Sequence, residues 1–223
     1  MEAIIGKSYL TEIPHEGGEI SFQYSPFRGT YGNVANEIDK AELKRPNSAE
    51  TASLVYDAWK NPEERDSSEI IKILRNRWFW EFTGNLYLPK SNEEINNGII
   101  LENNPKIVNG KLVMDKNSLI KRLKENDSSV KFVPFGYKIG GQTWKELANN
   151  KYIKERYGKE GAEKIAEIAS KYKNNPYVNI FNSVNKEETI MSVLYDDWDF
   201  NLRLVVLGDW DGKFDGLAFG VKK

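Results

Sequence analysis

Large aromatic side chains occupy every second position over residues 78–83, which indicates a β-strand. One side of this strand carries three aromatic rings, and the other carries an aromatic ring, an acid and a hydroxyl: Trp78, Trp80 and Phe82 against Phe79, Glu81 and Thr83. Because both sides carry bulky groups, we expect the strand to lie inside a sheet and to be covered on both faces. The following Gly84 and Asn85 predict either a bulge or a tight turn.

Two helices are predicted to lead into this strand. Asn47 followed by Glu50 has the spacing of a capping box, and apolar residues then recur at helical intervals. Asp66 and Glu69 predict the same kind of start for a second helix. The chain should therefore reach the aromatic strand through two capped helices.

Turn residues and periodicity indicate the other elements. Residues 7–13 and 19–24 predict an N-terminal hairpin, and Asn109-Gly110 between apolar pairs predicts a hairpin with a type I′ turn. The remaining predicted elements are helices over 34–41, 116–125 and 142–172, and strands over 130–135, 177–181, 189–195, 202–207 and 217–221.

This order of elements predicts an α+β fold. We expect a mainly antiparallel sheet with an N-terminal hairpin and a C-terminal meander, and helices segregated in the middle of the chain. Residues 1–223 should form a single compact domain, in which any joint between subdomains would fall near residues 90–98. Strands from both ends of the chain are expected to share one sheet.

Composition narrows the class of protein. The 223 residues are 39% hydrophobic and 12% aromatic, which is typical of a globular protein. No apolar run approaches the ~20 residues of a membrane helix, and the first residues do not resemble a signal peptide. The absence of cysteine excludes disulfides, thiolate metal sites and cysteine nucleophiles. We therefore expect a cytoplasmic protein that does not bind membranes.

Charge is unevenly distributed along the chain. The net charge is −1, but residues 102–173 hold 16 lysine and arginine residues against nine acids. Basic and aromatic residues within 121–156 would suit a nucleic-acid surface. The near-neutral total charge weighs against that partner, and solvated helix faces explain the same residues.

The loop between the N-terminal hairpin and the first helix is a candidate ligand site. Arg28 supplies a cation, Thr30 and Tyr31 supply hydroxyls, and Asn33 supplies an amide beside a helix N-terminus. These groups would suit a phosphate or carboxylate. The alternative is an ordinary strand-to-helix turn in which Arg28 pairs with a surface acid.

Glu81 is the candidate catalytic acid or base. A carboxyl group buried without a cation has a raised pKa, as general acids and bases require. Arg77 should share its side of the strand, Arg75 lies close in sequence, and Tyr24 could assist. The alternative is a structural ion pair or a hydrogen bond from a tyrosine to Glu81.

Acidic residues near the C-terminus are candidate ligands for a divalent cation. Asp209, Asp211 and Asp215 partly match the start of a calcium loop, but they lack its downstream glutamate. A second group, Asp196, Asp197 and Asp199, could converge with them if two hairpins were neighbours. The alternative is that both groups are solvated turn residues.

These residues suggest two functions. The first is a non-catalytic binding or accessory protein that recognises an anionic small molecule or macromolecule through Arg28, Arg75 and Arg77. The second is a carboxylate- and arginine-based hydrolase, with or without a divalent metal, that acts on a phosphate- or sugar-containing substrate. No motif indicates a particular cofactor, and His15, the single histidine, excludes multi-histidine metal sites.

Overall fold

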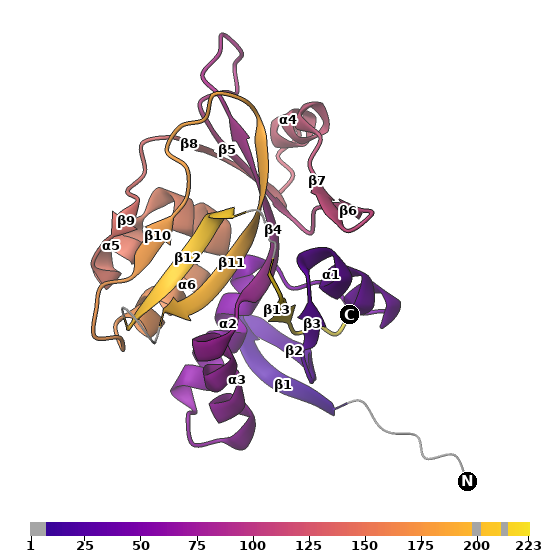
Figure 1. Cartoon of the computed structure of the whole chain (residues 1–223), viewed down its shortest axis with the longest axis vertical. Coiled ribbons are helices and arrows are strands. Elements are labelled where there is room, and N and C mark those ends of the chain that lie inside the picture. Colours follow the sequence, from indigo (N-terminus) through magenta and orange to yellow (C-terminus); the bar gives the residue numbers. More distant parts are fainter. Residues whose placement is uncertain (1–7, 198–201, 211–213) are drawn as a thin grey trace.

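The computed structural model describes residues 8–197, 202–210 and 214–223 (Figure 1). Its main sheet runs in the order β3, β13, β4, β11, β12, β10, β9, and β5 and β8 continue from β4. The bounds are β3 Phe27–Gly29, β13 Gly216–Ala218, β4 Phe79–Leu88, β11 Glu188–Asp197, β12 Arg203–Trp210, β10 Tyr177–Asn179, β9 Gly140–Gly141, β5 Gly98–Asn103 and β8 Val130–Pro134. Most neighbours are antiparallel, which confirms the predicted α+β class.

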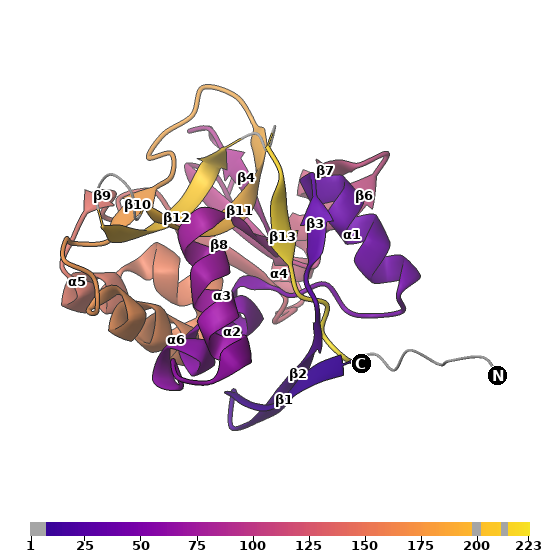
Figure 2. The ribbon, with the colours of Figure 1, turned by 60° about the horizontal axis from the view of Figure 1, so that its bottom comes forward.

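Helices cover both faces of this sheet. One face packs against α2 (Ser48–Lys60), α3 (Arg65–Asn76), α5 (Trp144–Asn149) and α6 (Lys151–Ala169), which lie together below the sheet in Figure 2. The other face packs against α1 (Tyr31–Lys40), the hairpin of β6 (Lys106–Val108) and β7 (Lys111–Val113), and α4 (Lys116–Lys124).

The aromatic strand β4 is the interior strand that the sequence predicts. All ten of its residues are buried, and it pairs with β11 on one side and with β5 and β13 on the other. Trp80 and Phe82 point toward α1, whereas Phe79 joins the core under the helices. The strand continues through Gly84, and its register with β11 shifts nearby, so this position is a bulge and no turn. A Cβ on Gly84 would lie 2.7 Å from Met114 Sδ, which explains the glycine.

The two predicted capping boxes have different outcomes. In α2 the Asn47 side chain accepts from the Glu50 amide at 2.9 Å, and Glu50 accepts from the Asn47 amide at 2.9 Å, as predicted. The box at Asp66 is wrong, because α3 begins two residues earlier than an N-cap at Asp66 would place it, with Glu64 as an N-cap that makes no side-chain hydrogen bond.

Both predicted hairpins form. β1 (Ser8–His15) and β2 (Gly18–Tyr24) make a separate two-stranded sheet, to which the C-terminal Val221 bridges at Phe22. In the β6–β7 hairpin Asn109 and Gly110 have φ values of 50° and 74°, as a type I′ turn requires.

The C-terminal strands pair in a more complex order than a simple meander. β11 and β12 are antiparallel neighbours, but β10 lies parallel to β12, and β13 lies parallel to β4 between β4 and β3. Strands from the two ends of the chain thus share one sheet, as expected. No helix in the described ranges is long and apolar enough to cross a membrane. The single-domain organisation stays a prediction.

Candidate functional site

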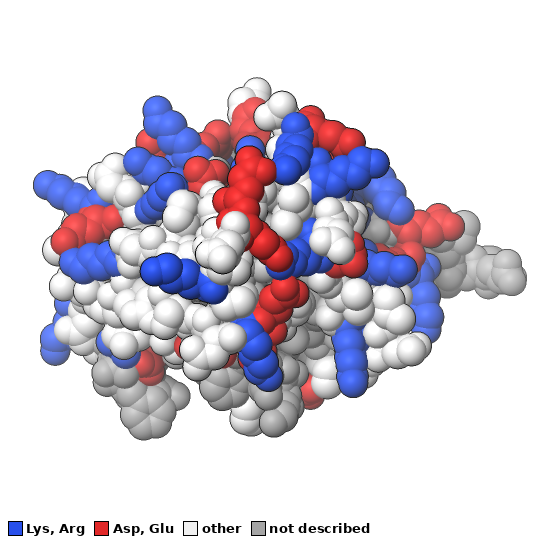
Figure 3. Space-filling model, turned by 90° about the horizontal axis from the view of Figure 1, so that it is seen from above, with Lys and Arg blue, Asp and Glu red and all other residues white. Residues whose placement is uncertain are grey.

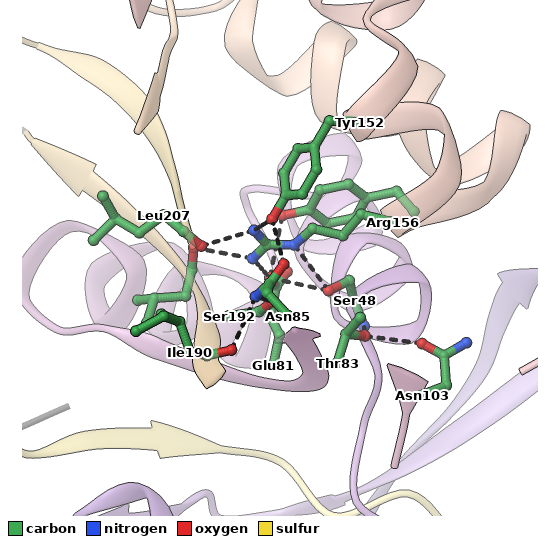
Figure 4. A network of polar contacts seen from close by, with 12 residues as sticks. Ser48, Glu81, Thr83, Asn85, Asn103, Tyr152, Arg156, Ile190, Ser192 and Leu207 are labelled. Atoms are coloured by element: carbon green, nitrogen blue, oxygen red, sulfur yellow. Dashed lines mark hydrogen bonds and ion pairs between the residues drawn. The ribbon is translucent and has the colours of Figure 1, made fainter. Parts of the chain in front are cut away.

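Glu81 lies at the centre of a polar network inside the core, between β4 and helices α2 and α6 (Figure 4). Its Oε2 atom contacts the guanidinium of Arg156 and accepts hydrogen bonds from Ser48 Oγ and from the Tyr157 hydroxyl, each at 3.2 Å. The side chains of both Glu81 and Arg156 have no exposed area. No substrate can therefore reach the Glu81 carboxyl in this structure.

Arg156 ties this network to three segments of the fold. Its guanidinium donates to the Leu207 carbonyl at 2.7 Å, to the Val193 carbonyl at 3.2 Å and to Ser48 Oγ at 3.1 Å. These contacts join α6 to β12, β11 and the first turn of α2. The arrangement matches the structural ion pair that was the alternative interpretation of Glu81.

Each of the two charged groups counteracts the effect of burial on the pKa of the other. Burial raises the pKa of Glu81, and the nearby Arg156 guanidinium acts in the opposite direction. Burial lowers the pKa of Arg156, but Glu81, Tyr152 and Tyr157 outweigh it, and the pKa lies above its ordinary value. Arg156 therefore stays a cation throughout the physiological range.

The other two catalytic candidates lie apart from Glu81. Arg77 was expected on the same side of the strand as Glu81, but it is the exposed C-cap residue of α3, because β4 begins only at Phe79. The Tyr24 hydroxyl donates to the Glu69 carboxylate, which raises the pKa of Tyr24 to about 12. The arrangement that a hydrolase would need is thus dispersed between the core and the surface.

In the loop that leads into α1, Tyr31 packs against aromatic rings of β4. The Tyr31 ring is 2% exposed, 4.7 Å from the Phe82 ring and edge-on to the Trp80 ring at 5.7 Å. The Trp80 indole nitrogen donates to the Gly29 carbonyl at 3.0 Å. The other candidates of this loop, Arg28, Thr30 and Asn33, are exposed.

Arg75 lies in a different cluster, on the side of the sheet that the helices cover. Its guanidinium lies 5.6 Å from the centre of the Trp59 ring, and its Nε atom lies 4.0 Å from Asp196 Oδ2. Asp196 also accepts a hydrogen bond of 2.9 Å from the Tyr172 hydroxyl. Arg28 and Arg75 are therefore not brought together with Glu81.

The acidic candidates for a metal site are only partly described. Asp209 is half-buried and Asp215 is exposed, whereas Asp211 and Asp199 lie outside the described residues. Burial raises the pKa of Asp209, whose Oδ1 atom has no hydrogen-bond partner in the described ranges. Among residues 8–197, 202–210 and 214–223, no group of three or more acidic or histidine side chains could hold a metal ion. The metal site stays a prediction.

The structure reveals a surface that sequence reasoning missed, which we call the aromatic surface. It lies on the side of β11 and β12 that faces away from α6, with no helix in front of these strands in Figure 1. Its members are partly exposed apolar or aromatic residues and one cation: Trp78, Tyr177, Met191, Tyr195, Phe214 and Arg203.

Ring contacts hold the aromatic surface together. The Trp78 ring lies 6.1 Å from the Tyr195 ring and 5.3 Å from the Phe214 ring, which is 55% exposed. The Arg203 guanidinium lies 4.4 Å from the centre of the Tyr177 ring, and its Nε atom is 3.7 Å from Asp197 Oδ2. Burial and the charge of Asp197 raise the pKa of Tyr195, so its hydroxyl stays neutral. The surface combines apolar area with polar groups at its edge.

Period-two alternation could have identified this surface from sequence. Tyr195 alternates with the inward Leu194, and Arg203 alternates with the inward Leu204. The prediction also required knowing that β11 and β12 are neighbours, since otherwise the two strands present separate residues.

Several basic residues in the region 121–156 lie beside acidic side chains. On the face of the molecule that Figure 3 shows, lysine and arginine side chains are interspersed with aspartate and glutamate. Arg122 pairs with Glu102 and with Asp127. Arg156, which the sequence suggested for a nucleic-acid surface, is only 2% exposed. For Arg156 that expectation is wrong, because the residue is the partner of Glu81.

Comparison with known proteins shows the fold. No family model and no curated protein matches this sequence. A solved structure described as "Accommodation of massive sequence variation in Nanoarchaeota by the C-type lectin fold" is similar to it, with a TM-score of 0.62 and 12% identity. The match covers 89% of this chain and 97% of the other. The chain thus shares the fold of that structure, the C-type lectin fold.

Proposed function

We propose that this chain is a non-catalytic binding protein that engages its ligand through the aromatic surface. The observation that carries the proposal is the cluster of Trp78, Tyr195 and Phe214, which exposes aromatic rings on a sheet whose opposite face is buried under helices. Exposed aromatic clusters on folded proteins mark interaction sites more often than single exposed apolar residues do.

The fold supports this proposal. The similar structure is described as a C-type lectin fold that accommodates massive sequence variation. A fold tolerates variation where side chains do not fill its core. Here the inward residues of β11 and β12 are buried, while the outward Met191, Tyr195 and Arg203 are partly exposed and can change at lower cost.

We propose a protein segment as the ligand. Tryptophan, tyrosine and arginine are the residue types that contribute most to protein–protein binding, and a rigid aromatic ring loses little entropy when it is covered. Trp78, Tyr177, Tyr195 and Arg203 supply these types on one rigid sheet.

The narrower proposal is that the ligand carries negative charge. Arg203 supports it, because this partly exposed cation lies on the aromatic surface itself, 4.4 Å from the centre of the Tyr177 ring. A ligand carboxylate at this surface would gain a charge-assisted contact with the Arg203 guanidinium. Binding would then weaken as salt is added, and Arg203→Gln would reduce that salt dependence. Arg28 is not part of this surface, because it pairs in register with Leu217, whose side chain belongs to the core under the helices.

A phage-displayed library of random peptides tests the binding surface without requiring a known ligand. Peptides enriched on the wild-type protein should lose binding to Phe214→Ala, whose side chain is largely exposed and whose loss should leave the fold intact. Trp144→Ala is the matched control, because Trp144 is 45% exposed and lies on α5, away from this surface. Selected peptides that bind Phe214→Ala as tightly as they bind Trp144→Ala would contradict the proposal.

A further inference from the structure

A polar cavity of about 430 Å³ lies on the side of the sheet opposite to the aromatic surface. Five segments meet around it: the β1–β2 turn, the start of α2, the end of β5, the entry into β8, and α6 at the position where Gly158 interrupts the helix with φ 70°. Pockets that hold small ligands have volumes of roughly 300–1,000 Å³. The cavity is therefore large enough for a small organic molecule.

Two hydrogen-bond donors that line the cavity have no acceptor among the described residues. In the first turn of α2 the amides of Ser48 and Glu50 bond to Thr83 Oγ1 and Asn47 Oδ1, but no bond is made by the Ala49 amide within the described residues. The Asn103 side chain accepts from Thr83 at 2.9 Å, which leaves its amide nitrogen without an acceptor in the same ranges.

Lysine side chains add positive charge to these donors. Lys131 is exposed at the cavity and has no acidic partner in the part of the chain that the structure describes. Lys44 also lines the cavity, although it contacts Glu50. The start of the 13-residue helix α2 contributes a partial positive charge next to them. This part of the cavity suits an oxyanion.

Hydrogen-bond acceptors lie on other walls of the same cavity. The carboxylates of Glu16 and Glu155 and the hydroxyl of Ser128 are exposed there. Carboxylates accept hydrogen bonds from hydroxyl groups but repel a second anion. A ligand that is anionic at one end and hydroxylated at the other would satisfy both sets of groups.

We propose that this cavity binds a small ligand that carries one oxyanion and several hydroxyl groups, such as a sugar phosphate. Phosphate oxygens contact Lys131 and the Ala49 amide, and the sugar hydroxyls donate to Glu155 and Glu16. The site is independent of the aromatic surface, because α2 and α6 lie on the other face of the sheet.

The test uses three probes with the full chain: glucose 6-phosphate, inorganic phosphate and glucose. Amide signals of Ala49, Asn103 and Asn104 are followed by NMR during titration of each probe. We expect glucose 6-phosphate to shift these signals and to bind more tightly than either part alone. Shifts absent from all three residues would overturn the proposal, and so would equal affinity for glucose 6-phosphate and inorganic phosphate.

A matched pair of lysine variants separates the site from general charge attraction. Lys131→Met should weaken glucose 6-phosphate binding about tenfold, as expected when one charge-assisted hydrogen bond is lost. Lys121→Met removes another exposed charge, which lies on α4 outside the cavity, and should leave binding unchanged. If both variants bound glucose 6-phosphate equally weakly, the proposal that the cavity is the binding site would be overturned. Neither residue belongs to the core, so both variants should fold.

Discussion

Glu81 and Arg156 are two charged residues in an interior where neither side chain has exposed area. Desolvating each charge costs several kcal/mol, and mutual attraction offsets this cost only when further hydrogen bonds satisfy both groups. Ser48, Tyr157 and the carbonyls of Val193 and Leu207 supply those bonds. The pair is therefore best understood as a structural junction of α2, α6 and the sheet.

Removing one member of this pair should be far more damaging than removing both. Arg156→Met leaves the Glu81 carboxylate buried without a cation, and we expect a loss of about 3–5 kcal/mol in the free energy of unfolding. Glu81→Met combined with Arg156→Met should recover much of that loss. Urea denaturation measures both values.

An exposed ion pair provides the control for this prediction. Lys138 and Glu146 are 2.7 Å apart, but their side chains are 49% and 48% exposed. Lys138→Met should cost under about 1 kcal/mol. If Arg156→Met cost no more than Lys138→Met, the structural role of the buried pair would be refuted.

Tyr24 should give a measurable pH dependence in the alkaline range. The bond to Glu69 and partial burial raise its pKa from 10.0 to about 12. Since the folded-state pKa is raised, the stabilisation is complete below pH 10 and is lost as the pH rises toward 12.

Tyr24→Phe removes this contribution. At pH 8 the variant should be less stable than the wild type by about 0.5 kcal/mol, a value reduced for solvent screening because the group is partly exposed. The difference should shrink in thermal melts taken between pH 9 and pH 11. A difference that stays constant or grows with pH would contradict the assignment.

At the scale of elements, turns show most clearly how local sequence sets the backbone. Gly110 has φ 74°, and a Cβ added there would meet no atom within 4 Å. Its requirement for glycine is therefore conformational and not steric. Gly141 is equally open but lacks a positive φ, so the two residues form a matched pair.

Gly110→Ala should destabilise the β6–β7 turn by about 1 kcal/mol, because alanine disfavours the left-handed conformation. Gly141→Ala should be nearly neutral by comparison. Chemical denaturation of the two variants under identical conditions checks this prediction. Equal losses in both variants would show that the turn type does not control stability here.

Local signals explain how much of the fold the sequence could predict. The capping box at Asn47 and the type I′ turn at Asn109 depend on neighbouring residues alone, and both are present as predicted. The pairing of β13 with β4 and the partnership of Arg156 with Glu81 join positions far apart in the chain. No local pattern contains that information, so Arg156 resembled any other basic helix residue.

The candidate site, too, could be predicted only where it depends on residues close together in the sequence. Glu81 could be identified as a buried acid from its apolar neighbours, but its isolation from solvent depends on α6. The aromatic surface depends on β11 and β12 lying side by side, with Trp78 and Phe214 reaching the same region. These contacts between distant segments could not be derived from periodicity.

At the scale of the whole molecule, the two faces of the sheet differ in what covers them. One face is buried under α2, α3, α5 and α6, which makes it a stable base. The other is covered by α1 and the β6–β7 hairpin near β4, and it is left partly open over β11 and β12. This asymmetry allows a rigid sheet to present side chains that the core does not need.

The most direct test of the account is the affinity of a library-selected peptide for Phe214→Ala relative to wild type, with Trp144→Ala as reference. We predict at least about tenfold weaker binding for Phe214→Ala, equivalent to about 1.4 kcal/mol, and an unchanged Kd for Trp144→Ala. An unchanged Kd for Phe214→Ala, or an equal loss in both variants, would contradict the assignment of the aromatic surface as the binding site.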